Sequence, residues 1–331
     1  MREFRRRPLL FRIWALASCA LPLFGGAAFA QGRGGPPRQF ELKAESPKFW
    51  DLFTEGSQLE KIATGFGFTE GPVWDPHGFL YVSDEQKNRI SRVYPDGRVE
   101  TLLEIGDPDG STLDGQSHFV TTASVLRAII QVEPDGRYQV LADKYEGKRF
   151  NSPNDIVVGP DGALYFTDPT LDLPKGETQE IPFQGVYRLG SDRSVRLLTK
   201  DLKAPNGLAF SPDGKRLYID DTNQREIRMY DVGPGMELQN GRLFGKEEGR
   251  GGVPDGMRVD SSGNVYCTGP GGVWVWDPQG NHIGTVMLPE STANFNWGDA
   301  DYRTIYFSSR TSIYRLRTKA QGFVPGAARA K

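Results

Sequence analysis

One short pattern recurs along most of this chain and constrains its fold more than any other feature. The pattern is a polar opening, a short apolar run, a tight turn containing glycine, and a second β-rich run. It is clearest at 151–169 (NSPNDIVVGPDGALYFTDP), with variants at 68–84, 204–221 and 253–269. A residue with a side-chain oxygen acceptor opens each unit. We call these residues the markers, and in these four units they are Glu70, Asn154, Asn206 and Asp255.

The spacing of the markers predicts six units. Successive markers lie 84, 52 and 49 residues apart, so the first gap conceals a further unit, which Asp109 opens. A last unit begins at Asn294, and the mean period is about 45 residues. In most units a glycine eight residues after the marker, such as Gly78 or Gly162, is typical of a hairpin turn. Four strands per repeat of roughly 45 residues are the signature of a propeller blade.

We therefore predict an all-β, six-bladed β-propeller over residues 46–320. The alternative, a pair of β-sandwiches, would not need one regular six-fold phase. The last unit holds only about three strands, whereas residues 58–64 (QLEKIAT) form an isolated strand before the first marker. We expect this N-terminal strand to close the last blade, which removes exposed sheet edges. Residues 31–45 are expected to be a flexible leader and 321–331 a flexible tail.

The first thirty residues have the pattern of a secretory signal peptide. A start rich in arginine is followed by an apolar run and by the small-x-small site Ala28-Phe29-Ala30. We therefore expect an exported protein, periplasmic or secreted. A lipoprotein is less favoured because an apolar stretch continues after the Cys19 box, and a membrane span is not expected because Arg12 interrupts the run.

Composition limits the possible partners. The chain has 40 Lys and Arg against 42 Asp and Glu, so its charge gives no reason to expect nucleic-acid binding. Nothing in the sequence implies an obligate protein partner. The partner that we expect is a small molecule.

The markers also predict a metal site. Residues at the same phase of different blades converge on one end of the propeller axis, and here they would bring together six oxygen-bearing side chains: Glu70, Asp109, Asn154, Asn206, Asp255 and Asn294. Carboxylates crowded together without a cation would have raised pKa values. Carboxylate and amide oxygens are the ligands that Ca²⁺ prefers. The alternative is that Asn-Gly and Asp-Gly are here only turn formers.

Four segments resemble one family. They are FTEGPVW at 68–74, NSPND at 151–155, PNGLAF at 205–210 and PDGM at 254–257. In order and spacing they are similar to the senescence marker protein (regucalcin)/gluconolactonase/luciferin-regenerating-enzyme family. The resemblance covers about Ile62 to Arg317. It implies a six-bladed propeller with one divalent metal ion on its axis that hydrolyses sugar lactones or related esters.

The resemblance also implies roles for particular residues. The metal ligands of the family fall on Glu70, Asn154, Asn206 and Asp255, with Ca²⁺ the expected ion and Zn²⁺ or another divalent ion the alternative. Asp255 is the expected catalytic acid or base. Three further residues are candidates for contact with a lactone substrate: Asn151, Asp168 and Asp109. Asn151 and Asp168 could equally be turn or strand-end residues.

Two classes of function remain open. The first is a metal-dependent lactonase. The second is a non-catalytic propeller that binds a ligand or a protein, with a purely structural Ca²⁺. Other catalytic schemes lack their residues, because HExxH, a P-loop and a GxGxxG turn are all missing from the sequence.

Overall fold

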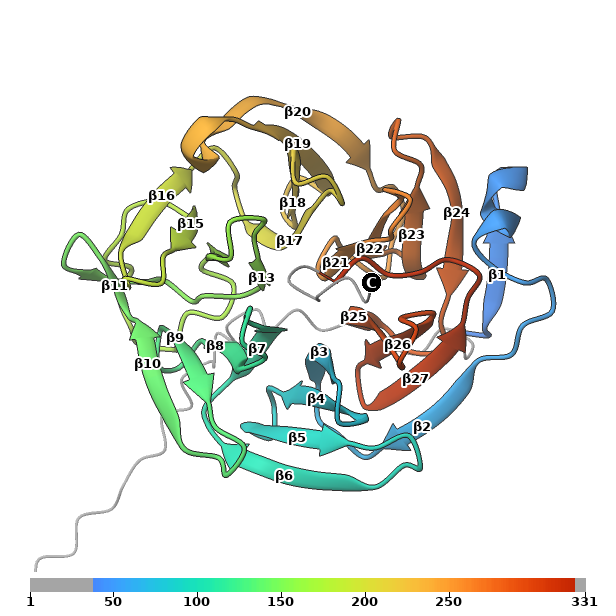
Figure 1. Cartoon of the computed structure of the whole chain (residues 1–331), viewed down its shortest axis with the longest axis horizontal. Helices are drawn as coiled ribbons and strands as arrows, with labels where there is room; N and C mark the ends of the chain where they lie inside the picture. The colour runs from blue at the N-terminus through green and yellow to red at the C-terminus, as the bar shows by residue number, and fades with distance from the viewer. Residues whose placement is uncertain (1–37, 325–331) are drawn as a thin grey trace, which may run out of the picture. The chain divides into compact units, whose positions relative to one another are not determined.

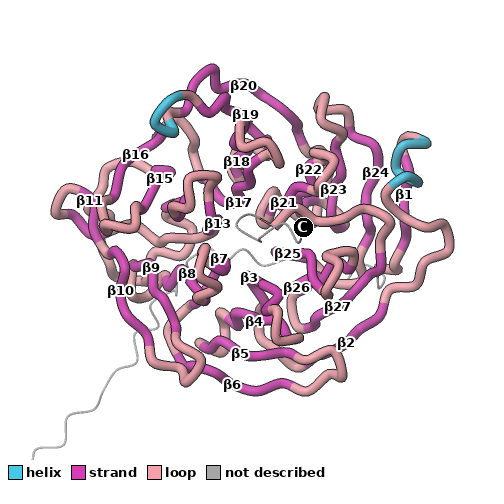
Figure 2. Tube along the Cα trace, viewed as in Figure 1, coloured by secondary structure: helices cyan, strands magenta, loops and turns pink. Residues whose placement is uncertain are grey.

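The computed structural model of the protein describes residues 38–324. Almost all regular structure in this part of the chain is β-strand, as Figure 2 shows. Two short 3₁₀ helices, η1 (Pro47–Asp51) and η2 (Pro234–Met236), complete it. No helix within residues 38–324 is both long and apolar enough to span a membrane.

Six antiparallel sheets surround a central axis (Figure 1). In the first four the strands run outward in chain order, and the fifth and sixth each add an N-terminal strand at the outer edge. The first blade contains β3 (Thr69–Asp75), β4 (Phe79–Asp84), β5 (Arg89–Val93) and β6 (Val99–Glu104). The second contains β7 (Pro108–Leu113), β8 (Phe119–Ala123), β9 (Ala128–Val132) and β10 (Tyr138–Ala142). The third contains β13 (Ile156–Val158), β14 (Leu164–Asp168), β15 (Gly185–Leu189) and β16 (Val195–Thr199).

The remaining blades follow the same order. The fourth contains β17 (Pro205–Phe210), β18 (Arg216–Asp221), β19 (Glu226–Val232) and β20 (Leu238–Lys246). The fifth contains β21 (Met257–Val259), β22 (Val265–Gly269), β23 (Gly272–Trp276) and β24 (His282–Met287). The sixth contains β25 (Thr292–Gly298), β26 (Thr304–Ser309) and β27 (Ser312–Arg317). A two-stranded ribbon, β11 (Lys144–Tyr145) with β12 (Lys148–Arg149), precedes the third blade. The predicted six-bladed propeller is confirmed.

The closure of the ring is also as predicted. The segment β2 (Glu60–Thr64) pairs antiparallel with β27 as the outer strand of the sixth blade. Its register places Glu60 opposite Arg315, and the two side chains form an ion pair with an Nε–Oε2 distance of 2.8 Å. The two ends of the domain therefore share one sheet, and β2 supplies the fourth strand of the sixth blade.

Apolar side chains fill the spaces between neighbouring blades. Leu80 and Val82 of the first blade, for example, pack with Tyr306 and Ile313 of the sixth. The strands are buried on both faces because each blade lies between two others, which explains their nearly continuous apolar runs. The predicted hairpin glycines have the expected backbone, as at Gly78 (φ +94°).

Both ends of the predicted domain need correction. The expected leader, 31–45, includes β1 (Glu41–Ala44), which pairs with β24 as a fifth strand of the fifth blade. Short alternating segments such as this one carry little signal in the sequence. The expected tail, 321–331, also begins inside the packed domain, because Gly322 bridges to Asp260 and the Phe323 N–H donates to the Val259 carbonyl oxygen at 3.0 Å. Residues 1–37 and 325–331, with the predicted signal peptide and the rest of the tail, lie outside the described residues.

Candidate metal centre and active site

The markers lie where the innermost strands approach one another. Glu70 and Asn206 are the second residues of β3 and β17, whereas Asn154 and Asp255 lie two residues before the first residues of β13 and β21. A glycine follows most markers. A Cβ at Gly207 would overlap the Asp255 carbonyl oxygen. These glycines are therefore required by close contact between neighbouring inner strands, which the turn-former alternative did not anticipate.

Three carboxylates form the centre of the site. Oxygens of Glu70, Glu85 and Asp109 lie within 4.8 Å of one another. The Asn154 Nδ2 donates to Asp109 Oδ2 at 2.6 Å and to Asp172 Oδ2 at 3.3 Å. Asp109, predicted to contact substrate, is thus part of the carboxylate group itself.

The other two predicted ligands join this group from the fourth and fifth blades. Burial raises the pKa of Asp255 well above its ordinary value, and repulsion from Glu70 adds to it, so the two carboxylates influence one another across the axis. A hydrogen bond from the Asn206 amide opposes this shift in part, and the Asn206 Nδ2 also donates to Thr222 Oγ1 at 3.3 Å. The structure therefore brings all four predicted ligands to one end of the channel.

The electrostatics of the site favour a cation. Burial raises the pKa of Glu70 to about 8, although hydrogen bonds from Gly71 N–H and the Asn294 amide oppose this effect. Burial raises the pKa of Asp109 well above its ordinary value, and repulsion from Glu85 and Glu70 adds to it. Carboxylates held this close at low dielectric are stable only when protonated or when neutralised by positive charge.

The residues present fit a hard divalent cation. Every side chain that converges here offers carboxylate or amide oxygen, and the one group of three potential metal ligands found among residues 38–324 contains neither His nor Cys. In Asn154 and Asn206 the amide nitrogens make the hydrogen bonds with protein, so that their oxygens are the atoms free to bind a cation. Oxygen donors of this kind match Ca²⁺.

Two members of the group, Glu85 and Asp172, were missed in the sequence. Glu85 follows the second strand of the first blade, one residue beyond the Thr69–Asp84 pair. Asp172 lies in the long connection between β14 and β15. Neither occupies the marker phase, so the repeat could not reveal them. The length of the β14–β15 connection was the available signal, because long loops in compact domains are often functional.

Asn151 and Asp168 do not face the mouth of the channel. Both are fully buried, and the Asn151 N–H donates to Asp168 Oδ2 at 2.9 Å. The Asn151 Nδ2 also donates to the carbonyl oxygens of Asp168 (3.1 Å) and Phe183 (2.9 Å). In this structure they anchor the connection that carries Asp172. Of the two roles considered for them, the strand-end role agrees with these contacts, and the predicted substrate contact has no exposed surface to support it.

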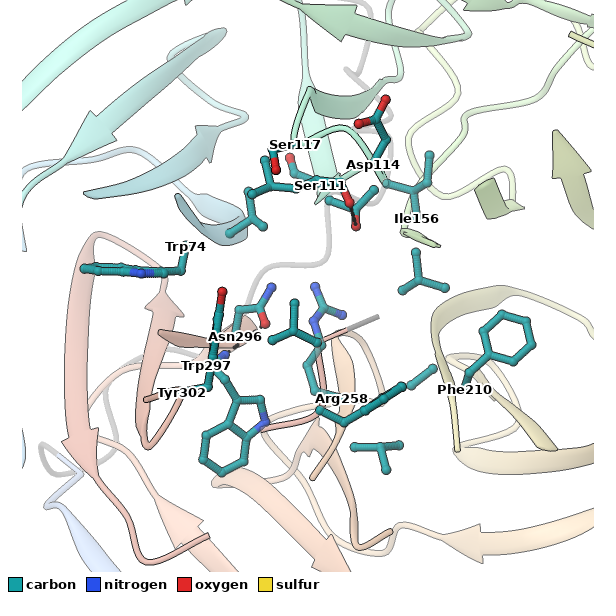
Figure 3. Close-up of a pocket in the computed structure, with 18 of the residues that line it drawn as sticks. Trp74, Ser111, Asp114, Ser117, Ile156, Phe210, Arg258, Asn296, Trp297 and Tyr302 are labelled. Atoms are coloured by element: carbon teal, nitrogen blue, oxygen red, sulfur yellow. Dashed lines mark hydrogen bonds between the residues drawn. The ribbon is translucent and has the colours of Figure 1, made fainter. Parts of the chain in front are cut away.

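The far end of the channel is separated from the carboxylate group. Arg258 Nη1 lies 3.2 Å from Asp155 Oδ2, and both side chains are buried. Beyond this ion pair is a cavity of about 110 Å³ (Figure 3), bordered by residues that follow the markers on the inner strands, including Ile156 and Trp297, and by Phe323 and Val324 of the C-terminal segment. Arg258 and Asn296 extend toward its centre in Figure 3.

Comparisons with known proteins agree with this geometry. The family model described as the SMP-30/Gluconolactonase/LRE-like region matches residues 68–311. The gluconolactonase of Zymomonas mobilis is 32% identical over 306 residues, covering 84% of this chain and 86% of that protein. The L-arabinolactonase of Azospirillum brasilense is 33% identical over 261 residues, covering 74% and 81%.

A solved structure of a gluconolactonase from Xanthomonas campestris superposes with a TM-score of 0.79 at 29% identity, covering 86% of this chain and 99% of that one. A regucalcin structure from Agrobacterium tumefaciens, at 20% identity, has a TM-score of 0.68 and supports the fold. The matched region contains all six markers and every strand from β4 to β26. The chain is therefore a member of the SMP-30/gluconolactonase/LRE-like family.

Proposed function

We propose that this protein is a metal-dependent lactonase that opens a sugar lactone to the corresponding hydroxy acid. The observation that carries the proposal is the convergence of Glu70, Glu85 and Asp109 within 4.8 Å at the end of the channel where Asp255 also lies. Its relatives among gluconolactonases and arabinolactonases give the substrate class.

The resident ion in this proposal is held by Glu70, Asn154, Asn206 and Asp255, with Ca²⁺ the best match to their oxygens. Asp109 and Glu85 lie beside Glu70 and add negative charge to the same site. When bound there, a divalent cation polarises the lactone carbonyl and stabilises the negative charge that develops on its oxygen.

The chain's own residues supply proton transfer and orientation. Asp255 is half-buried, so it can contact both the site and the substrate. We assign it the role of accepting a proton from the attacking water and returning it to the ring oxygen that leaves. The Asn206 amide holds this carboxylate in place.

A single substitution tests the proposal. The Asp255→Asn variant keeps an oxygen ligand but cannot act as a base, so kcat/KM on gluconolactone or an arabinolactone is expected to fall by about 10²- to 10⁴-fold. Cation stoichiometry, measured by elemental analysis, is expected to stay near that of the wild type. Chelation should abolish activity in the wild type, and added Ca²⁺ should restore it.

Two results would contradict the proposal. If Asp255→Asn binds the cation and hydrolyses a lactone panel as fast as the wild type, Asp255 has no catalytic role. If no member of the panel is hydrolysed although the cation is bound, the second class, a non-catalytic propeller with a structural ion, is favoured instead.

A further inference from the structure

A second group of acidic side chains lies in the interface between the fourth and fifth blades. Asp220 is on β18, Cys267 is on β22, and Glu247 follows β20. Their residues are almost completely buried, with exposed fractions of 0%, 0% and 1%. The Cys267 Sγ donates a hydrogen bond to Asp220 Oδ2 at 3.7 Å. None of the three is a marker, and the proposed hydrolysis uses none of them.

The other blades show what normally occupies this place. Asp220 is the next-to-last residue of the second strand of its blade. The same position carries Ser or Thr in every other blade: Ser83, Thr122, Thr167, Thr268 and Ser308. In three of them the hydroxyl donates to a carbonyl oxygen of the next blade, at 2.8 Å, 2.6 Å and 3.1 Å. An ionised carboxylate cannot donate this hydrogen bond, so the fourth blade departs from the pattern.

The surrounding backbone leaves room for both carboxylates. A Cβ at Gly207 would lie 2.5 Å from Asp220 Oδ2. A Cβ at Gly269 would overlap the carboxylate of Glu247. The fourth blade has Asp221 at the strand end where the fifth has Gly269. The space that holds Glu247 therefore depends on a glycine at this position.

The carboxylates have unmet bonding capacity. Asp220 Oδ1 and both oxygens of Glu247 are buried without a hydrogen-bond partner in the part of the chain the structure describes. Arg225 is the charged group that opposes the raised pKa of Glu247, but its Nη2 donates to the carbonyl oxygens of Gly249 (3.1 Å) and Gly252 (2.9 Å). Buried polar atoms without partners are rare and costly, and each one requires an explanation. Burial raises the pKa of both acids well above their ordinary values, and repulsion from Asp255 adds to this for Asp220.

We propose that Asp220, Glu247 and Cys267 form a second cation site, distinct from the Glu70 group and suited to Zn²⁺. A thiolate with two carboxylates is a ligand set that zinc accepts and Ca²⁺ does not. Zn–S and Zn–O bonds of about 2.3 Å and 2.1 Å at a tetrahedral angle separate sulfur and oxygen by about 3.6 Å. The observed distance between Sγ and Oδ2 is 3.7 Å.

Binding would change the local protonation and position of these groups. The thiol releases its proton to solvent on coordination, because the thiolate is the ligand form. The three ligands are less tightly gathered than those of Glu70, Glu85 and Asp109, so the carboxylates must turn inward by rotation of their side chains. A cation held by one oxygen of each carboxylate and by the thiolate would then neutralise the buried acids and tie the fourth blade to the fifth.

Cobalt substitution gives a direct test. Purified full-length protein is stripped with chelator, and Co²⁺ is added both to the folded protein and during refolding from urea, because the site is buried. A thiolate-bound Co²⁺ gives a charge-transfer band in the near ultraviolet, which an all-oxygen site cannot give. We expect this band in the wild type, with Zn²⁺ displacing it, and one more cation per chain than in Cys267→Ser.

Matched variants make the result decisive. Asp220→Ser restores the residue type of the other blades and should fold, but it should lose the band or weaken Co²⁺ binding by at least tenfold. Glu70→Gln alters the axial site and should keep the band. Absence of the band in the wild type after refolding, or its persistence in Cys267→Ser, would overturn the proposal. The carboxylates would then be a protonated pair.

Discussion

The ring closure depends on one carboxylate whose contribution can be measured. Glu290, in the loop after β24, accepts hydrogen bonds from three hydroxyls of the closing region: Thr311 Oγ1 (2.9 Å), Ser312 Oγ (2.7 Å) and Tyr314 Oη (2.7 Å). Lys61 of β2 also contacts it, with an Nζ–Oε1 distance of 3.3 Å. Glu290 thus joins the fifth blade to both strands that close the sixth.

The contribution of Glu290 to the free energy of unfolding can be worked out from the pKa of its carboxyl group. Burial alone would raise the pKa of Glu290, but the hydrogen bonds from Ser312, Tyr314 and Thr311 outweigh it and lower the pKa from 4.5 to about 2. A carboxyl group with a lowered pKa in the folded state stabilises the fold above its unfolded pKa, and this stability is lost as the pH falls toward the folded value. The difference corresponds to at most about 3 kcal/mol at neutral pH, and solvent screening of this partly exposed carboxylate reduces the contribution.

The perturbation is Glu290→Gln, and urea unfolding at several pH values is the assay. At neutral pH we expect the free energy of unfolding to fall by up to about 3 kcal/mol relative to the wild type. The difference should shrink steadily below about pH 4.5 and become small near pH 2, where about half of the wild-type carboxyl is itself protonated. Glu55→Gln, an exposed residue, is the matched control. A difference that is independent of pH would refute the reasoning.

Two further substitutions test the channel. Gly207→Ala should separate the fourth and fifth blades, because its Cβ would overlap the Asp255 carbonyl oxygen. We expect the free energy of unfolding to fall by about 1–3 kcal/mol and calorimetry to show weaker cation binding. Gly115→Ala is the control, because the space around Gly115 is open. Arg258→Met leaves the Asp155 carboxylate buried without its partner, and should lower the free energy of urea unfolding by about 3–5 kcal/mol. Restoration of stability in the Arg258→Met, Asp155→Asn double variant would confirm that the cost comes from the unpaired charge, whereas unchanged stability in the single variant would contradict it.

The fold was predictable because the same sequence pattern recurs in most of the blades. Each marker, turn glycine and strand appears several times, so that an uncertain unit such as that of Asp109 could be recognised by its phase. The role of residues 58–64 followed from counting strands, because the last unit had only about three strands and this segment was a strand that belonged to no unit. The contact between β2 and β27 confirms it.

What escaped prediction lies outside the repeat. Asp172 reaches the carboxylate group from the long β14–β15 connection, which has no equivalent of similar length in the other blades. The position of Glu85, one residue after the Thr69–Asp84 pair, is set by where β4 ends. β1 is a four-residue strand whose partner, β24, is more than 200 residues away, so nothing local could identify it. Predicting these contacts requires the three-dimensional distances between residues, which the spacing of a sequence repeat does not give.

The shared sixth blade also has a consequence for the order of assembly. Glu60 and Arg315 meet across 255 residues of chain, so β2 has no partner until nearly the whole domain has been synthesised. Glu70 lies on β3, the next strand after β2, whereas Asn206 and Asp255 belong to the fourth and fifth blades. A chain that stops before β27 has every one of these side chains but no completed circle to hold them together. Contacts this distant form late because they close a long loop. We therefore expect the carboxylate site to form only after β2 and β27 have paired.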